Sequence, residues 1–406
     1  MGFFLLFTVL LVSCGGNTAV IWTDRPEFAL YGDYFNTVQN QYKVTVRYLE
    51  YPGEALEDSH VNPDIVVGSW LKNFSTDTYF KSLDGLFGKK KIPRNLFYSK
   101  ILTAGKAGRN QHLLPVSFNI PALIFSKERE HDIINSFTID FEEVKQLSKG
   151  YNVESRSTYT RMGFSPLWDD NFLLTAAVLY GVSFREALPL AWDTTALDKS
   201  MDYIYNWTHE INSNNQAEEE FTFKYFIEPP ERLAISGRIL FSYMESNELF
   251  TLTEENKNHI DFRWIMEQDR VPITDASVFL GIHKRAKAKR AAKAFVLWFF
   301  QTENQRLLME YFRVNGINEG VFWDMRRVFL ADPGYGADFF RIFYPELLGR
   351  MPPAEYLMPP NVLPGNWAII KERVVLPYLH DRARTTNISE VYPLERRLSD
   401  WIRMNR

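Results

Sequence analysis

The chain has 406 residues, of which 46% are hydrophobic and 24% are charged, as in an ordinary globular protein of two domains or one large one. A formal net charge of −4 gives no ground for expecting a nucleic-acid partner or a strongly anionic ligand. The single cysteine excludes an internal disulfide, and a chain of this length needs neither a disulfide nor a metal for stability.

The chain begins with an apolar stretch, MGFFLLFTVLLVS, that leads directly to its one cysteine, Cys14. The part from Phe3 to Val12 is too short to span a bilayer and has the length of a signal-peptide core. Leu11–Val12–Ser13–Cys14 resembles the lipobox of bacterial lipoproteins, although no basic residue precedes the stretch. The resemblance implies a signal peptide over residues 1–13 and a lipid anchor through Cys14 to a bacterial membrane, facing the periplasm or cell exterior. The alternative is a buried or free cysteine at the end of an N-terminal core strand.

Strand, helix and strand follow one another over the first part of the chain. The apolar segment Ala19 to Trp22 is expected to be a buried strand, and Thr23 or Asp24 can cap the helix that follows it. Val44 to Glu50 alternates between apolar and polar residues as a strand does, and Pro63 to Trp70 is typical of a buried strand. This βαβ order predicts a mostly parallel sheet with helices on its faces.

Two apolar strands lie between Leu113 and Lys127, interrupted by Pro115 and Pro121. Because proline is tolerated only at strand edges, ends and turns, this segment is expected to cross from one part of the fold to another. Further elements are expected along the rest of the chain: helices over 138–150, 169–181, 198–211, 229–236, 283–300, 302–313, 367–380 and 389–404, strands over 238–245 and 278–282, and loops over 214–220 and 351–365.

Several segments, taken in order, resemble one protein family. They are IWTDRPEF after the lipobox, PDIVVGSW, LLPVSFNIPALIFSK, GFSPLWDDNFLL and FLGIHKRAKAKRAAKAFVLWFFQTENQ. Their order is similar to that of the extracellular solute-binding proteins of ABC importers, in the sugar-binding group related to maltose-binding protein. The resemblance runs from Cys14 to about Arg313 and is weak beyond Gly320.

The resemblance implies an α/β periplasmic-binding-protein fold with two lobes, each a mostly parallel sheet flanked by helices, joined by a multi-strand hinge. The N-terminal lobe would comprise residues 15–118 and 276–313, and the C-terminal lobe 119–275 and 314–406. Crossings would fall near 115–121, 272–277 and 314–316. The family binds a solute between its lobes as a monomer, closes around it and delivers it to a membrane permease.

Five candidate ligand-binding residues lie at the ends of the first strands and at the first crossing, where open α/β sheets bind ligands. Trp22 can stack on a sugar ring and Asp24 can accept its hydroxyl hydrogens, but Trp22 equally suits a core and Asp24 a helix cap. Glu50 is either a ligand acceptor or a solvated strand end, and Trp70 either faces the cleft or packs on the next helix. Asn119, a polar residue in an apolar stretch, must bond either to ligand or to backbone.

Five more candidates come from the second lobe. Trp168, beside two carboxylates, is the sharpest sugar-stacking candidate, while Asp169 either binds ligand or caps the following helix. Tyr243 and Glu245 end a predicted strand, where Glu245 can accept hydrogen bonds from a ligand. Trp367 can form the far wall of the cleft, although a core position on the next helix is the favoured alternative.

The sequence contains no pattern that indicates an enzyme. Its seven histidines have no metal-ligand spacing, and it lacks a nucleophile elbow, a P-loop and a dinucleotide fingerprint, so no catalytic residue, metal site or cofactor is expected. The sequence therefore predicts a substrate-binding lipoprotein for a carbohydrate. The alternatives are a binder of another small solute, such as a polyamine, an oxyanion or a metal, and a structural surface lipoprotein or an enzyme on the same fold.

Overall fold

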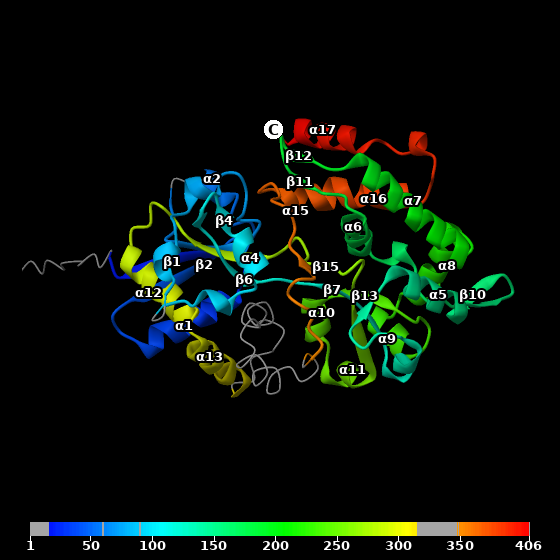
Figure 1. The fold of residues 1–406 in the computed structure, drawn as a ribbon, viewed down its shortest axis with the longest axis horizontal. Helices are drawn as coiled ribbons and strands as arrows, with labels where there is room; N and C mark the ends of the chain where they lie inside the picture. Colours follow the sequence, from blue (N-terminus) through cyan, green and yellow to red (C-terminus); the bar gives the residue numbers. More distant parts are fainter. Residues whose placement is uncertain (1–15, 59–60, 89–90, 315–346, 348, 406) are drawn as a thin grey trace, which may run out of the picture.

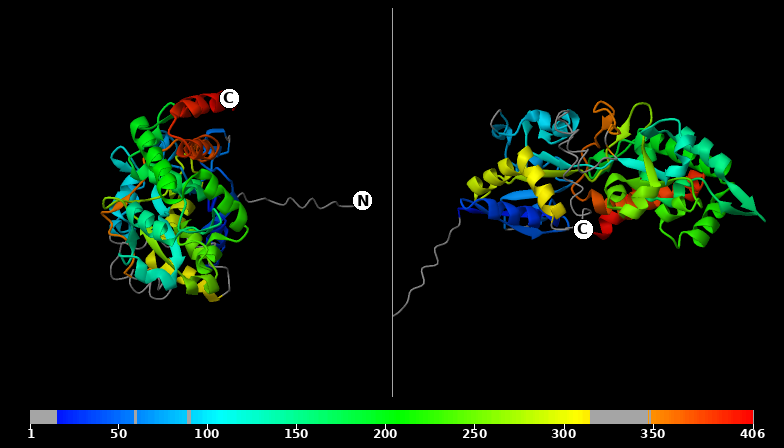
Figure 2. Two further views of the ribbon diagram at one scale, coloured as in Figure 1. Left: turned by 90° about the vertical axis from the view of Figure 1, so that its right-hand side faces the viewer. Right: turned by 90° about the horizontal axis from the view of Figure 1, so that it is seen from below.

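The computed structural model describes residues 16–58, 61–88, 91–314, 347 and 349–405, which form two α/β lobes lying side by side (Figures 1 and 2). Each lobe is built around its own sheet, and helices flank both sheets. The two-lobe α/β class expected from the sequence is therefore confirmed. Cys14 and the apolar stretch before it lie outside the described residues.

The sheet of the first lobe has five strands in the order β2-β1-β3-β16-β6. β1 is parallel to β2 and β3, whereas β16 runs antiparallel to β3 and β6, so β16 is its one reversed strand. Every residue of β3 and β16 is buried, as central strands covered on both faces require. The bounds are β1 Thr18–Thr23, β2 Lys43–Tyr48, β3 Ile65–Ser69, β6 Leu114–Ser117 and β16 Val278–Ile282, with α1 Glu27–Val38, α12 Lys289–Phe299 and α13 Thr302–Val314 in the same lobe.

The sheet of the second lobe has four strands in the order β13-β7-β14-β8. Its reversed strand is β7, which is antiparallel to both β13 and β14, while β14 is parallel to β8. The bounds are β7 Pro121–Ser126, β8 Thr138–Ile139, β13 Ser242–Glu245 and β14 Ile260–Ile265.

One hydrophobic cluster joins the helices of the second lobe to the end of the chain. This cluster contains Phe172 and Trp207 as well as Trp367 and Leu379 from the C-terminal helices, all of them buried. The helices involved are α5 Phe141–Tyr151, α6 Asp170–Leu179, α7 Thr194–Ile211, α15 Trp367–Ile370, α16 Leu376–Ala383 and α17 Leu394–Met404. The C-terminal helices thus extend the second lobe (Figure 1).

The chain passes between the two sheets twice within the described residues. It leaves the first sheet at Ser117 and enters the second at Pro121. After β14 it runs through β15 (Val271–Pro272), which pairs in parallel with β17 (Leu357–Met358), and returns to the first sheet at Val278. These passages coincide with the crossings expected near 115–121 and 272–277, and the one expected near 314–316 runs into residues outside the described part.

Shorter elements complete the two lobes. The helices are α2 Ala55–Asp58, α3 Thr76–Tyr79, α4 Ser99–Ala104, α8 Asn215–Tyr225, α9 Pro230–Ile235, α10 Ser246–Thr251 and α11 Glu254–His259. Three small hairpins pair β4 Lys106–Ala107 with β5 Asn110–Gln111, β9 Val153–Ser155 with β10 Thr158–Arg161, and β11 Arg185–Glu186 with β12 Leu190–Ala191.

The structure corrects several local predictions. The expected loop over 351–365 contains the short strand β17, and the helices expected to begin at 283 and 389 begin at Lys289 and Leu394. The strand expected over 238–245 is limited to Ser242–Glu245. The acidic segment 214–220, expected as a loop, lies in helix α8, because the Asn214 side chain caps its first turn by accepting from the Ala217 N–H at 2.9 Å. The helix α1 begins at Glu27 after Pro26, and neither Thr23 nor Asp24 caps it. The Asp24 carboxylate instead accepts the backbone N–H of Ser69 at 3.3 Å, across the ends of two strands.

Candidate functional site

Two cavities lie where the chain passes between the lobes. Cavity 1, about 270 Å³, is formed mainly by the second lobe and is lined by Asn171, Leu174, Thr175, Val178, Gly181, Val182, Tyr243, Glu245, Arg270, Pro272, Thr274 and Trp367, among others. Cavity 2, about 260 Å³, is formed by both lobes and is lined by Trp70, Lys72, Ile101, Ala104, Ser277, Phe279 and Val362, among others. Six residues line both cavities: Ile273, Asp275, Pro359, Pro360, Asn361 and Leu363.

Most of the wall that the two cavities share is a proline-rich segment between β17 and α15, residues 359–366, which we call the strap. The rest of the shared wall is Ile273 and Asp275. Asn361 holds the strap to the second lobe by donating to the Ser183 hydroxyl at 3.0 Å and to the Phe184 carbonyl at 3.1 Å. The Val362 carbonyl accepts the N–H of Glu186 at 2.6 Å. The strap is therefore bonded to the second lobe and lies between the two cavities.

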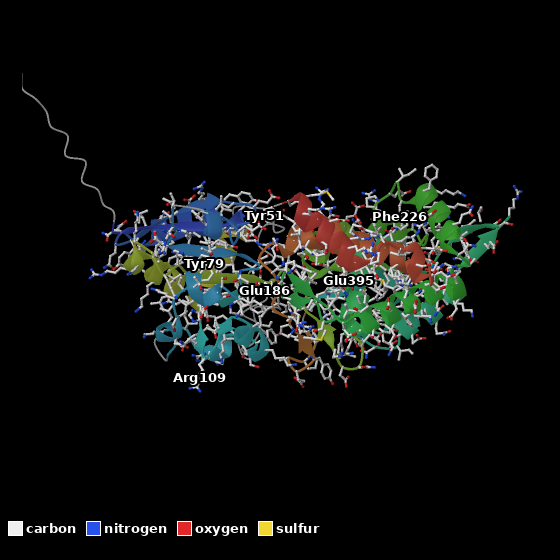
Figure 3. The ribbon with its side chains drawn as sticks, turned by 90° about the horizontal axis from the view of Figure 1, so that it is seen from above. Tyr51, Tyr79, Arg109, Glu186, Phe226 and Glu395 are labelled. Atoms are coloured by element: carbon white, nitrogen blue, oxygen red, sulfur yellow. The ribbon has the colours of Figure 1, made fainter. Side chains whose placement is uncertain are left out.

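The hairpin of β11 and β12 connects the strap to the first lobe. One Glu186 carboxylate oxygen accepts the backbone N–H of Phe74 at 2.6 Å, and Glu186 is labelled between the two lobes in Figure 3. A single residue of the second lobe thus bonds to both the strap and the first lobe.

Asp275, between β15 and β16, is the polar centre of the shared wall. Its carboxylate accepts the indole N–H of Trp367 at 2.5 Å and pairs with the Lys371 ammonium at 3.0 Å. Burial alone would lower the pKa of Lys371, but the adjacent Asp275 carboxylate raises this pKa above the ordinary value, so the ammonium group stays charged. This pair connects the second crossing to the helical segment that directly follows α15.

Several polar groups of cavity 1 already have hydrogen-bond partners. The Tyr243 hydroxyl lies 3.1 Å from that of Thr175 on α6, and burial raises the pKa of Tyr243, which keeps the phenol neutral. Glu245 forms a reciprocal capping box with Glu248 at the start of α10. Arg270 donates to the Leu179 carbonyl at 2.9 Å. Around these groups the lining is mostly aliphatic, with prolines and aromatic rings, as is usual for small-molecule sites.

Cavity 2 contains two donors of a different kind. Trp70 directly follows β3, adopts a left-handed backbone conformation with φ of 54°, and has a buried indole N–H with no hydrogen-bond partner. Lys72 is half-buried, and loss of hydration lowers the pKa of its ammonium group.

Four of the ten predicted residues line the cavities. Tyr243, Glu245 and Trp367 lie on cavity 1, and Trp70 lies on cavity 2. The sequence identified these positions because they end strands or follow the proline-rich stretch. The structure brings them together from three distant parts of the chain.

Four other predicted residues lie along neither cavity. Trp22 is a core residue, 2% exposed, with the Arg47 guanidinium 5.6 Å from its ring. Asp24 bridges strand ends, and Glu50 is exposed. Asn119 is buried at the first crossing, where its carbonyl accepts the N–H of Thr274 at 2.8 Å and its side chain interacts with Ser246. Asn119 therefore links the two crossings.

Trp168 and Asp169 also lie off the linings of both cavities. The Trp168 ring stacks on Phe221, with centroids 5.7 Å apart and planes at 18°, and touches Phe226 at 4.9 Å. Asp169 caps α6 by accepting from the Asn171 N–H at 2.8 Å, and burial raises the pKa of its carboxyl group to about 6. In this structure Trp168 packs against aromatic rings and Asp169 caps a helix.

Among the polar residues that the fold brings to the cavities and that sequence reasoning missed are Asn171, Arg270, Asp275 and Lys72. Asp275 lies within the segment expected to cross between the lobes, which is a signal that could have found it. Lys72 follows Trp70 by two residues, but its sequence neighbours do not distinguish it from a solvated lysine.

Within the described ranges, no group of His, Cys, Asp or Glu side chains is arranged to hold a metal ion. None of the helices in the same part of the chain has the length and apolar composition needed to cross a bilayer.

Solved structures of similar shape are solute-binding proteins. An ABC substrate-binding protein from Listeria monocytogenes in complex with cycloalternan superposes with a TM-score of 0.64 at 13% identity, over 95% of this chain and 97% of that one. CpMnBP1 with mannotriose bound gives 0.60 at 11% identity, over 95% and 98%. A cyclic alpha-maltosyl-1,6-maltose binding protein from Arthrobacter globiformis gives 0.58 at 14% identity, over 95% and 96%.

No family model and no curated protein matches the sequence. The identities to the solved structures are low, but each likeness covers nearly the whole of both chains. The chain therefore has the fold of the two-lobe solute-binding proteins of ABC importers.

Proposed function

We propose that this protein is the substrate-binding component of an ABC importer and that it binds a carbohydrate between its lobes. The observation that carries the proposal is the pair of cavities at the crossings, lined by Tyr243, Trp367 and Trp70 together with hydrogen-bonding groups. Sugars present apolar ring faces and polar edges, which aromatic rings and fixed polar groups complement. The carbohydrates bound by the structurally similar proteins support this ligand class.

The proposed mechanism is closure of two lobes about the crossing strands. The lobes would comprise residues 15–118 with 276–313 and residues 119–275 with 314–406, in keeping with the division of strands between the two sheets. A ligand that contacts both lobes stabilises the closed arrangement because it binds that arrangement more tightly. A membrane permease would then recognise the closed form.

The proposal extends to the location of the protein. A lipid on Cys14 would hold the protein at a bacterial membrane on the periplasmic or outer side, near its permease. Mass spectrometry of the protein purified from membranes tests this: an N-terminal diacylated Cys14 supports the anchor, and an intact Met1 with an unmodified Cys14 contradicts it.

The experiment that tests the function is a thermal-shift screen of the full chain in mild detergent against oligosaccharides, polyamines, oxyanions and divalent metals. A ligand at a hundred times its dissociation constant stabilises the folded state by about 2.7 kcal/mol. A shift with a carbohydrate supports the proposal, whereas shifts with only polyamines, oxyanions or metals contradict the carbohydrate assignment.

Calorimetry of one variant then locates the site. Tyr243→Phe, which removes a hydroxyl from cavity 1, is expected to weaken carbohydrate binding about tenfold. Tyr159→Phe is the matched control, because the Tyr159 hydroxyl bonds to Ser213 on the surface of the same lobe and lines neither cavity. Equal affinities of both variants and the unaltered protein would exclude cavity 1 as the site.

A further inference from the structure

Cavity 2 contains hydrogen-bond donors without acceptors. The Trp70 indole N–H is buried and has no partner, and the Lys72 ammonium forms no hydrogen bond or ion pair with any residue of the described chain. The Ser277 hydroxyl, which also lines cavity 2, reaches only the Thr274 carbonyl at 3.5 Å. A buried indole N–H without an acceptor costs free energy, and a half-buried ammonium group without an ion-pair partner belongs to the same lining, so this part of the cavity lacks an acceptor.

The charged groups around the shared wall are, in contrast, already paired. Asp275 is neutralised by Lys371 and accepts the indole N–H of Trp367. Arg270 on cavity 1 donates to the Leu179 carbonyl. Asp275 therefore does not act as the counter-charge for Lys72.

The other carboxylates that face Lys72 do not satisfy it either. Asp77 and Glu186 both act on it through space, but neither forms an ion pair with it within the described residues. The Glu186 carboxylate is engaged by the backbone N–H of Phe74. Burial accordingly outweighs these two charges, and the pKa of Lys72 lies below its ordinary value.

We propose that cavity 2 binds the carboxylate of an acidic sugar, with Lys72 and the Trp70 indole N–H as its two donors. This inference rests on the proposed function and names its ligand class, a carbohydrate that carries a uronate or a similar carboxylate. A carboxylate supplies two acceptor oxygens and one negative charge, which match two N–H donors, one of them cationic. The neutral part of the sugar would extend along the strap toward cavity 1, where the Tyr243 and Thr175 hydroxyls bond to each other and Arg270 is engaged by the Leu179 carbonyl.

The test compares each charged sugar with its own neutral ester. Oligomers of galacturonate, glucuronate and mannuronate and their methyl esters are titrated into the full chain by calorimetry. At least one uronate is expected to bind about tenfold or more tightly than its ester, because a charged donor strongly discriminates against loss of its partner's charge.

The outcomes separate this inference from the proposed function. Binding of neutral oligosaccharides with equal or weaker binding of every uronate overturns the acidic-sugar inference and leaves the proposed function standing. Failure of every carbohydrate, charged or neutral, overturns both.

Variants of Lys72 test the donor directly. Lys72→Gln is expected to reduce uronate affinity to that of the ester, whereas Lys72→Arg retains most of the preference because it keeps the charge. Lys81→Gln is the matched control, since Lys81 is also a partly buried lysine of the first lobe with a lowered pKa, but it lines neither cavity. A uronate preference that survives in Lys72→Gln, with an unchanged circular dichroism spectrum, overturns the assignment.

Trp70 and the pH profile provide two independent readouts. Trp70→Phe keeps an aromatic ring and removes only the indole donor, so the uronate is expected to lose more affinity than the ester. Uronate affinity should fall as pH rises through the lowered pKa of Lys72, while ester affinity stays flat. Identical pH profiles for the two ligands would contradict the pairing with Lys72.

Discussion

Trp168 is held by aromatic neighbours on two sides. Its ring stacks on Phe221 and meets Phe164 edge-on at 5.9 Å, and these contacts join α8 to the body of the second lobe. The property that suggests sugar stacking, a broad apolar face, is the same property that lets a tryptophan complete a hydrophobic core. Only the neighbours decide between the two uses.

Replacing Trp168 by alanine is therefore expected to cost about 3 kcal/mol of unfolding free energy, through lost contacts and a cavity in the aromatic cluster. Ligand affinity should be unchanged under conditions where the protein stays folded. Urea unfolding and calorimetry measure the two quantities. A loss of ligand affinity without a loss of unfolding free energy would show that Trp168 belongs to the binding site.

Glu218 on α8 is a second residue whose surroundings determine its properties, in this case the pKa of its carboxyl group. It is 2% exposed, its carboxylate accepts from Asn212 at 2.6 Å, and burial raises its pKa from 4.5 to about 7. Because the folded state binds the proton more tightly than the unfolded state, the stability that this proton contributes is present below pH 4.5 and is lost as pH rises to about 7.

The Glu218→Gln variant should remove this pH dependence, because an amide does not titrate. The difference in unfolding free energy between pH 5 and pH 8 should shrink by up to about 3 kcal/mol, as a shift of about two pKa units implies. Urea titrations at the two pH values measure it. Glu219→Gln, at an exposed neighbouring position, should leave the difference nearly unchanged, and an equal effect of both variants would contradict the assignment.

At the scale of elements, close packing of helix α5 depends on one glycine. A Cβ atom at Gly163, just after β10, would lie 2.3 Å from Cα of Ser148 in α5, so no side chain fits without moving the helix. Gly150, in the last turn of the same helix, has no atom within 4 Å of its Cβ position.

The two glycines should therefore respond in opposite ways to alanine. Gly163→Ala is expected to lose about 2 kcal/mol of unfolding free energy through steric strain. Gly150→Ala should gain about 0.5 kcal/mol, because alanine restricts the unfolded chain and favours the helix. Thermal unfolding of both variants checks the signs, and destabilisation by Gly150→Ala would show that α5 requires that glycine as well.

Several elements followed from local chemistry alone. The strands of the first sheet appear where periodicity placed them, and helices α5 and α7 end within a residue of their expected ends, because one face of each must be buried. Their starts were wrong, since α5 begins at Phe141 rather than at 138 and α7 begins at Thr194 rather than at 198. Helix α8 was not predicted, because its run of three glutamates indicated a solvated loop and gave no sign that Phe221 packs against Trp168. Those contacts come from a segment about 50 residues earlier in the chain and have no local signature.

At the scale of the whole molecule, the ion pair of Asp275 and Lys371 joins the second crossing to the helical segment that directly follows α15. Both side chains are nearly buried, at 12% and 13% exposure. Removing one partner leaves an uncompensated charge in a poorly hydrated place, which is more costly than the pair is favourable.

Asp275→Ala is accordingly expected to lose about 3 kcal/mol of unfolding free energy, and Lys371→Met should lose less, because a carboxylate beside the cavities can recover some water. The double variant should be more stable than the sum of the single losses predicts. A double-mutant cycle by urea unfolding measures this coupling. Strictly additive losses would show that the pair contributes no coupling between crossing and helix.

The sequence by itself determined the class of the fold. Alternation of strands and helices, the prolines at Pro115 and Pro121, and the order of the family-like segments all predict two α/β lobes joined by crossing strands. Each of these signals is local, since it depends on the burial of one face or on the missing N–H of proline.

Only the tertiary structure decided which residues form the cavities. Tyr243 and Trp70 were found because they end strands, whereas Lys72 and Arg270 look like ordinary surface residues in the sequence. A cavity is the space left between segments that are distant in the chain, so its lining depends on how the strap from 359 to 366 lies against both lobes. Hydrophobic periodicity predicts which face of a helix or strand is buried, but it does not predict which polar side chains come together around a cavity.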